Sequence, residues 1–108
     1  MKTNLIFLLS ASIMLFSCKK DKTPEVIVCD QDISFASQIK PMMDTYCTSC
    51  HQSQAPILTN HSEISANATA ILNSIKGNTQ LMPLGGPALN DSLIQQFNCW
   101  IQQGKPNN

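Results

Sequence analysis

The chain has 108 residues, of which 43% are hydrophobic and 13% charged, with seven lysines, seven acidic residues and no arginine. This length provides for one domain rather than several. A near-neutral chain, in which lysines cluster only at residues 19–22, has no electrostatic basis for binding nucleic acid, so we expect no nucleic-acid partner.

Residues 1–17 are typical of a signal peptide. Lys2 gives a positive start, and residues 5–16 are almost entirely apolar but fall short of the roughly 20 residues that a membrane-spanning helix needs. The stretch ends in LFSC, which resembles the lipobox of bacterial lipoproteins, where the cysteine is lipidated and the chain is cut before it. We therefore predict lipidation at Cys18. An ordinary secretory signal with an unrelated cysteine is the alternative, because Phe16 departs from the commonest lipobox.

The next segment, residues 18–28, is expected to be a solvated tether between lipid and domain. Its KKDKTPE stretch has five charges in seven residues, a proline and no apolar group to bury. A lipidated Cys18 would place the protein outside the cytoplasm, as a bacterial cell membrane lipoprotein on the periplasmic or outer-surface side. The remaining domain, 29–108, is small, and domains of this size usually need a disulfide, a metal or a large cofactor.

Three helical stretches predict an all-α domain. The first covers 32–47, and Pro41 is expected to kink or break it. The second begins at Asn60, an expected N-cap with Glu63 in the capping-box position, and stops at Gly77.

The third predicted helix follows Asn90 and ends at Gly104, with one apolar face. That face consists of Leu93, Ile94, Phe97, Trp100 and Ile101. Between the second and third helices, residues 77–89 contain three glycines and two prolines, which predicts a long, stiffened loop.

The sequence CTSCH at residues 47–51 matches C-x-x-C-H, the attachment signature of c-type haem. At positions i and i+3 of a helical turn, the sulfurs of Cys47 and Cys50 face the same edge of the porphyrin and can form thioethers with its vinyl groups. His51 then becomes the proximal ligand of the iron. We predict one covalently bound haem c.

Two other interpretations of this motif have less support. A zinc site needs four ligands, and no second Cys or His pair occurs at a usable spacing. A thioredoxin-like dithiol follows a buried strand, and no strand is predicted before Cys47.

Met82, in LMPLGGPAL, is the predicted sixth ligand, because Pro83 and Pro87 stiffen its loop and the glycines permit close approach to the porphyrin.

Taken together, residues 35–105 resemble the short monohaem domains of class I c-type cytochromes. The stretches that carry the resemblance are FASQIKPMMDTYCTSCH, IKG leading into MP, and LNDSLIQQFNCWIQQGKP. The resemblance implies a cytochrome c-like helical domain wrapped around one haem, with His51 and Met82 as axial ligands and with the first and last helices crossing near one edge. It implies electron transfer between redox protein partners, and no enzymatic activity.

Two alternative functions stay open. The first is a role as a haem subunit or docking module of a larger respiratory or dehydrogenase complex. The second is a catalytic or sensor haem protein with a labile sixth ligand, although a ligating Met82 argues against it.

Lipidation and haem attachment would leave Cys29 and Cys99. Two remaining cysteines in an oxidising compartment favour a disulfide over two free thiols, and the family resemblance brings their helices together.

His61 is expected to be a solvated histidine rather than the sixth ligand. Pro56 indicates a turn in which a nearby carbonyl accepts the Nδ1 proton of His51, without identifying that carbonyl.

Overall fold

The computed structural model describes residues 27–108, so the predicted signal peptide, Cys18 and most of the predicted tether lie outside the described residues. This part of the chain is all-α, with six helical elements and no strand: η1 (Phe35–Ile39), α1 (Lys40–Tyr46), α2 (Thr48–His51), α3 (His61–Ala66), α4 (Ala68–Ile75) and α5 (Asp91–Gln102). Between residues 27 and 108, no helix has both the length and the apolar character needed to cross a membrane.

The break expected at Pro41 is present. Residues of η1 form one π-helical segment, and α1 begins at Lys40 with Pro41 in its first turn, where the missing N–H of proline costs nothing. Ser34 caps η1, because its hydroxyl accepts a hydrogen bond from the backbone N–H of Ser37. The helix therefore changes from π to α geometry between Ile39 and Lys40, and α1 then leads into the CTSCH motif.

The second predicted helix is two helices rather than one. Asn67 interrupts it with φ −102° and ψ 7°, and its side-chain amide donates to the carbonyl oxygen of Glu63 at 2.8 Å. Asparagine favours such local side-chain bonds, which compete with continued helix. Asn60 caps α3 as expected, accepting from the N–H of Glu63 at 3.0 Å.

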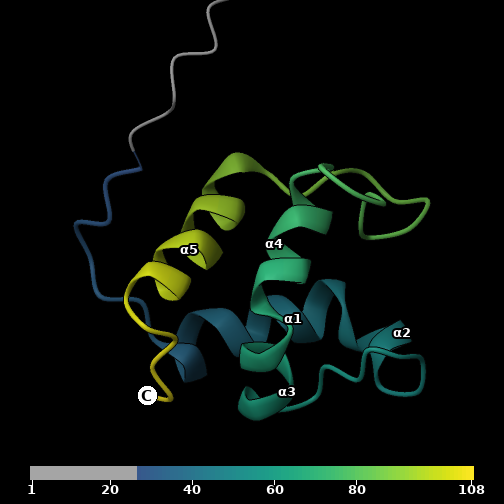
Figure 1. The fold of residues 1–108 in the computed structure, drawn as a ribbon, viewed down its shortest axis with the longest axis horizontal. Coiled ribbons are helices and arrows are strands. Elements are labelled where there is room, and N and C mark those ends of the chain that lie inside the picture. The colour runs from purple at the N-terminus through teal and green to yellow at the C-terminus, as the bar shows by residue number, and fades with distance from the viewer. Residues whose placement is uncertain (1–26) are drawn as a thin grey trace, which may run out of the picture.

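The last helix, α5, packs against both η1 and α4, and Figure 1 shows it lying across the domain beside α4. Its N-cap is Asn90, whose side chain accepts from the N–H of Leu93 at 2.9 Å. The apolar faces of these helices meet in one core. Its buried members are Ile33, Phe35, Ile39, Met42, Met43, Leu58, Ile64, Ala68, Ile71, Ile75, Leu89, Phe97, Cys99 and Trp100.

A disulfide joins the segment before η1 to the last helix. Cys29 and Cys99 are bonded, with their Cα atoms 5.4 Å apart and a sequence separation of 70. Gln103 adds a second link, because its side chain accepts from the N–H of Ile33 at 2.9 Å and donates to the carbonyl of Gln31 at 2.7 Å. The first and last parts of the described chain are thus held to each other.

Candidate functional site

The CTSCH residues occupy one helical turn. Cys47 lies between the two helices, as the C-cap of α1 and the N-cap of α2, and Cys50 and His51 lie on α2. The backbone N–H groups of Cys50 and His51 both donate to the carbonyl of Cys47, at 3.2 and 2.9 Å. Cys47 and Cys50 are free thiols, so the local fold places two unbonded sulfurs and one imidazole within a single turn.

One side of the His51 ring is occupied by the polypeptide. Its Nδ1 lies 2.9 Å from the carbonyl oxygen of Pro56 and 3.2 Å from that of Gln54. Carbonyl oxygens only accept hydrogen bonds, so these contacts favour the tautomer with the proton on Nδ1 and a free lone pair on Nε2. The backbone N–H of Leu58 donates to the carbonyl of His51 at 2.8 Å and closes this loop. The accepting carbonyl that the sequence left unidentified is therefore chiefly that of Pro56 itself.

The two thiols differ in environment. Burial raises the pKa of the Cys47 thiol to about 11, whereas Cys50 is exposed. The raised pKa keeps the Cys47 thiol protonated at neutral pH. Residues 27–108 also contain no group of three or more His, Cys, Asp or Glu side chains arranged to hold a bare metal ion.

Met82 lies in the loop between α4 and α5, and this loop is fixed to the end of α4. The N–H of Met82 donates to the carbonyl of Ser74 at 3.2 Å, and the hydroxyls of Ser74 and Thr79 are 3.2 Å apart. Gly77 makes the turn out of α4 with φ +73°, a conformation that favours glycine. The Met82 side chain is half-buried. The loop extends toward the same end of the domain as α2 (Figure 1).

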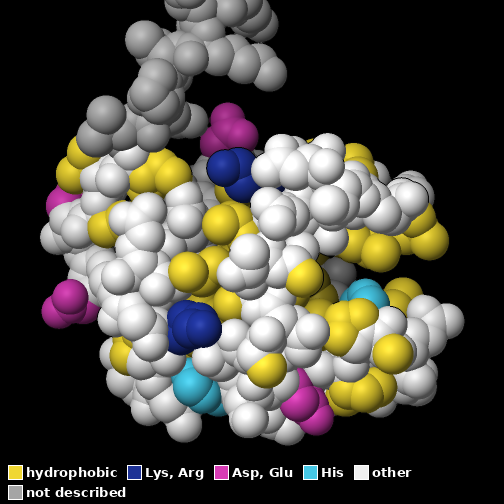
Figure 2. Space-filling view, in the orientation of Figure 1, with side chains coloured by type: hydrophobic (Ala, Val, Ile, Leu, Met, Phe, Trp, Pro, Cys, Tyr) yellow, Lys and Arg dark blue, Asp and Glu magenta, His cyan; other side chains and the backbone are white. Residues whose placement is uncertain are grey.

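Apolar side chains are exposed at this end of the domain. Three of the four exposed large hydrophobic residues between 27 and 108 flank the predicted ligands: Tyr46 precedes the CTSCH motif, and Leu81 and Leu84 lie on either side of Met82–Pro83. Figure 2 shows a notch between the α4–α5 loop and the α2 region, with hydrophobic side chains on both edges. Exposed apolar groups gathered in this way mark a surface that another apolar group covers.

These residues fit a haem. The donor set is an imidazole with a free Nε2, a thioether and two unbonded thiols, and its surroundings are apolar. A hard cation would need oxygen ligands, whereas a thiol-attached porphyrin needs sulfur, imidazole and an apolar lining. The sequence predicted Cys47, Cys50 and His51 as donors from their spacing, and Met82 from the composition of its loop. It gave no indication that Tyr46, Leu81 and Leu84 would be exposed.

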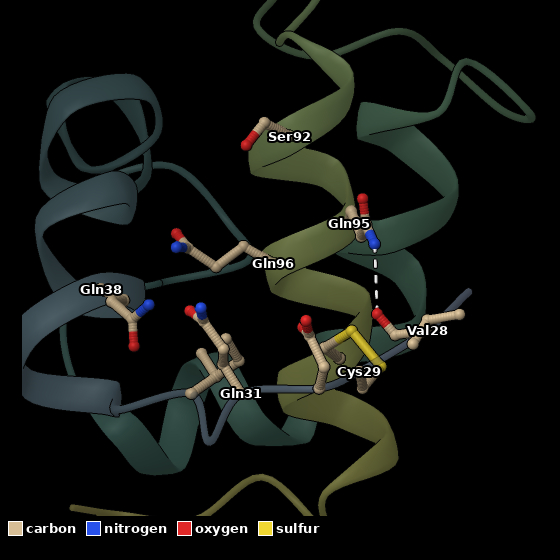
Figure 3. Close-up of a pocket in the computed structure, with 10 residues that line it drawn as sticks. Val28, Cys29, Gln31, Gln38, Ser92, Gln95 and Gln96 are labelled. Carbon is tan, nitrogen blue, oxygen red and sulfur yellow. Dashed lines mark hydrogen bonds between the residues drawn. A yellow bond between two sulfur atoms is a disulfide. The ribbon is translucent and has the colours of Figure 1, made fainter.

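A second hollow lies beside the disulfide, between α5 and the segment that leads into η1. It has a volume of about 220 Å³ and is lined by residues 28–31, Ile33, Gln38 and, on α5, Ser92, Gln95, Gln96 and Cys99. Figure 3 shows the amide groups of Gln31, Gln38, Gln95 and Gln96 around it, with Gln95 donating to the carbonyl of Val28. Of the predicted site residues it contains only Cys29 and Cys99, so it is separate from the CTSCH turn.

The expectation that His61 is solvated is wrong. Its ring is half-buried against Phe35 and Trp100, with ring centroids 4.8 and 5.8 Å away in edge-to-face geometry. Its Nε2 lies 2.9 Å from the carbonyl oxygen of Lys105. The sequence placed His61 correctly at the start of a helix, but it could not show that the segment after α5 folds back over that position. His61 is thus a structural residue and is already engaged on its Nε2 side.

Comparisons of the chain with protein-family models, with curated proteins and with solved structures found no significant match. No relative therefore supplies a function by similarity. The functional assignment depends on the CTSCH turn, the Met82 loop and the apolar surface between them.

Proposed function

We propose that this protein is a monohaem c-type cytochrome that transfers electrons between protein partners. One haem c would be attached through thioethers at Cys47 and Cys50, with His51 and Met82 as axial ligands. The observation that carries the proposal is the single turn of α2 that holds both free thiols and an imidazole whose Nδ1 is bonded to the carbonyl of Pro56. This combination leaves Nε2 as the only free donor atom of the ring.

Each part of the site has a physical task in this proposal. The thiols at i and i+3 fix the edge of the porphyrin, and the Pro56 carbonyl fixes the orientation of the His51 ring. The bond from the Met82 N–H to Ser74 holds the thioether-bearing loop against α4. When bound, the haem iron would supply one-electron chemistry, and the methionine thioether would raise its reduction potential relative to a second histidine.

Electron transfer is favoured over catalysis because the polypeptide supplies both axial ligands in this proposal. A catalytic or sensor haem protein needs an open or labile position at the iron. Residues 27–108 contain only one other histidine, His61, and its Nε2 is engaged by Lys105. Nothing in the described residues favours a role as a subunit of one particular larger complex, which co-purification of the native protein would detect.

Substitution of Met82 tests the proposal. In the ferric holoprotein, thioether ligation gives a weak charge-transfer absorption in the far red, and Met82→Ala is expected to abolish it. The variant should also bind added imidazole or cyanide readily and have a lower reduction potential. Leu81→Ala is the matched control, because it removes apolar surface from the same loop and leaves the thioether in place. An unchanged spectrum and potential in Met82→Ala would contradict ligation by Met82.

Membrane attachment is a separate part of the proposal. Cys18, outside the described residues, is proposed to carry the lipid that keeps the domain at a bacterial cell membrane. Metabolic labelling with a fatty acid should mark the wild type and leave Cys18→Ala unlabelled and released from membranes. Equal membrane retention of the two forms would contradict the lipid anchor.

A further inference from the structure

Hydrogen bonds that join distant parts of the sequence gather at one end of the domain. Between residues 27 and 108, hydrogen bonds span either 10 positions or fewer, or at least 40. All of the long ones join residues 28–36 or 61–65 to residues 95–108. We call these three segments the clamp. They include both disulfide cysteines and none of the proposed haem-binding residues. In Figure 1, α5 and the C-terminus lie on the side of the domain away from α2.

The segment before η1 lies along one face of α5. Gln95, Cys99 and Gln103 are spaced so that they share a face of the helix and of its C-cap. The side-chain amide of Gln95 donates to the carbonyl of Val28 at 3.3 Å. Cys99 carries the disulfide, and Gln103 makes its two bonds to residues 31–33. Figure 3 shows the bond to Val28 and the disulfide. Successive turns of one helix face therefore hold this segment in place.

Asn108 supports the start of η1. Its main-chain oxygen accepts from the N–H of Ala36 at 2.8 Å and from the hydroxyl of Ser34 at 3.0 Å. Its side-chain oxygen accepts from the N–H of Phe35 at 2.8 Å. The first N–H groups of a helix have no partner within that helix, so Asn108 supplies acceptors that η1 itself lacks.

The segment after α5 also reaches α3. The ammonium group of Lys105 donates to the carbonyl of Ser65 at 3.3 Å, and the carbonyl of Lys105 accepts from the ring of His61. The indole N–H of the fully buried Trp100 donates to the carbonyl of Pro106 at 3.0 Å. The clamp thus combines a disulfide, a buried aromatic side chain and polar contacts, and the polypeptide itself makes all of them.

We propose that the clamp is a folding unit that forms before haem attachment, so that the attaching reaction acts on a partly folded chain. The order of the two steps rests on the proposed function, whereas the folding of the clamp does not. Proteins open in cooperative units of different stability, and units with many buried contacts are the more stable ones. The disulfide, with a sequence separation of 70, also restricts the unfolded chain.

Disulfide formation is the reaction that must come first. The thiols of Cys29 and Cys99 lose two protons and two electrons to an oxidant that itself carries a disulfide, and that oxidant is released as a dithiol. Cys47 and Cys50 remain thiols and later form the thioethers. The hydrogen bonds that flank Cys29 along α5 favour this pairing, because they hold Cys29 beside Cys99.

The CTSCH turn and the Met82 loop are held differently. Their backbone bonds run to nearby residues, such as the bond from the N–H of Met82 to Ser74 and that from the N–H of Leu58 to His51. The haem would add thioether bonds to the turn and an axial bond to each segment. Haem attachment should therefore slow the opening of these segments much more than the opening of the clamp.

Hydrogen exchange of the full chain, followed by NMR, tests the proposal. The haem-free variant Cys47→Ala/Cys50→Ala cannot form thioethers and keeps the disulfide. In this variant, the N–H groups of Ile33 and Ala36 should have protection factors at least about tenfold higher than that of Met82. The wild-type chain expressed without a haem attachment system should behave in the same way. In the holoprotein, the protection factor of Met82 should rise by more than about tenfold and those of Ile33 and Ala36 by less.

A pair of glutamine variants tests the links within the clamp. Gln103→Leu removes the side chain that bonds to Ile33 and should lower the protection of Ile33 in the haem-free chain. Gln96→Leu is the matched control on the same face of the domain, since the Gln96 side chain lines the hollow instead, and it should leave that protection unchanged.

Two outcomes separate this inference from the proposed function. Protection factors of Ile33 and Ala36 no higher than that of Met82, in both haem-free chains, would overturn the folding unit even if the holoprotein has a haem spectrum. A chain that takes up no haem would overturn the proposed function and the order of the two steps. Slow exchange in the clamp would then still establish the folding unit.

Discussion

The Nδ1 atom of His51 lies 2.9 Å from the carbonyl oxygen of Pro56, five residues later in the chain. This contact uses the Nδ1 proton and leaves Nε2 available as an electron-pair donor. The contact therefore determines which nitrogen of the imidazole is available to a metal. Main-chain carbonyls of the loop that follows His51 therefore fix the orientation and the tautomer that its proposed role as a ligand requires.

The tautomer of His51 follows from this contact. Long-range ¹H–¹⁵N NMR correlations of the ring in the haem-free protein should show a protonated Nδ1 and an unprotonated Nε2. His61 is the internal control and should show the opposite pattern, because its Nε2 donates to the carbonyl of Lys105. A protonated Nε2 in neutral His51 would contradict the assignment of Nε2 as the free donor.

Removal of the disulfide should destabilise the domain. Bonding Cys29 to Cys99 closes a loop with a sequence separation of 70, and the chain-entropy relation gives a contribution of about 4 kcal/mol for a loop of this size. The double variant Cys29→Ala/Cys99→Ala should show a corresponding loss in the free energy of unfolding of the holoprotein, measured in denaturant. Reduction of the wild type provides the control, and a loss below about 1 kcal/mol in both experiments would contradict this role.

His61 is expected to contribute to stability and to leave the iron site unchanged. His61→Ala removes one hydrogen bond and edge-to-face contacts with Phe35 and Trp100, for a combined loss of about 2 kcal/mol. His61→Phe keeps an aromatic ring and should lose less. Both holoproteins should retain the wild-type absorption spectrum. A spectral change in both variants would show that His61 reaches the iron.

The Glu63 carboxylate should titrate below its ordinary pKa. The chief cause is the hydrogen bond from the backbone N–H of Thr59, followed by that from the Thr59 hydroxyl. Because the folded-state pKa is lowered, the stabilisation is present above the unfolded-state pKa and is lost as the pH falls through the folded-state value. Carboxyl-carbon NMR titration should find the lowered pKa, and Thr59→Val should raise it only in part, because the backbone donor remains. An ordinary pKa in the wild type would contradict these bonds.

The sequence predicted those parts of the fold that depend on local chemistry. Pro41 predicted the break before CTSCH, and Asn60 and Asn90 predicted the starts of α3 and α5. Asn67 was missed because the apolar spacing of the helix continues across it, and only its own side-chain bond shows the interruption. The sequence did not indicate that the Glu63 side chain would also accept from the N–H and hydroxyl of Thr59, the residue before the N-cap.

The parts of the site that depend on tertiary contacts were not predictable. His61 was expected to be solvated because its local sequence is polar, whereas residues far along the chain, Phe35 and Trp100, cover it. The exposure of Leu81 and Leu84 likewise depends on how their loop lies over the domain. In contrast, the spacing of the CTSCH residues correctly predicted that Cys47, Cys50 and His51 share one helical turn, because that geometry brings positions i, i+3 and i+4 together.

Covalent attachment of haem at Cys47 and Cys50 is the central claim, and intact-protein mass spectrometry of the denatured holoprotein tests it most directly. The protein is expressed with a c-type haem attachment system, extracted with acid and acetone, and weighed. We expect the polypeptide to retain the mass of one haem, and Cys50→Ala to lose most of its holoprotein. Ser49→Ala, at the adjacent exposed position of the same turn, is the control and should retain the haem. Release of the haem from the wild type, leaving a polypeptide of unmodified mass, would contradict the claim.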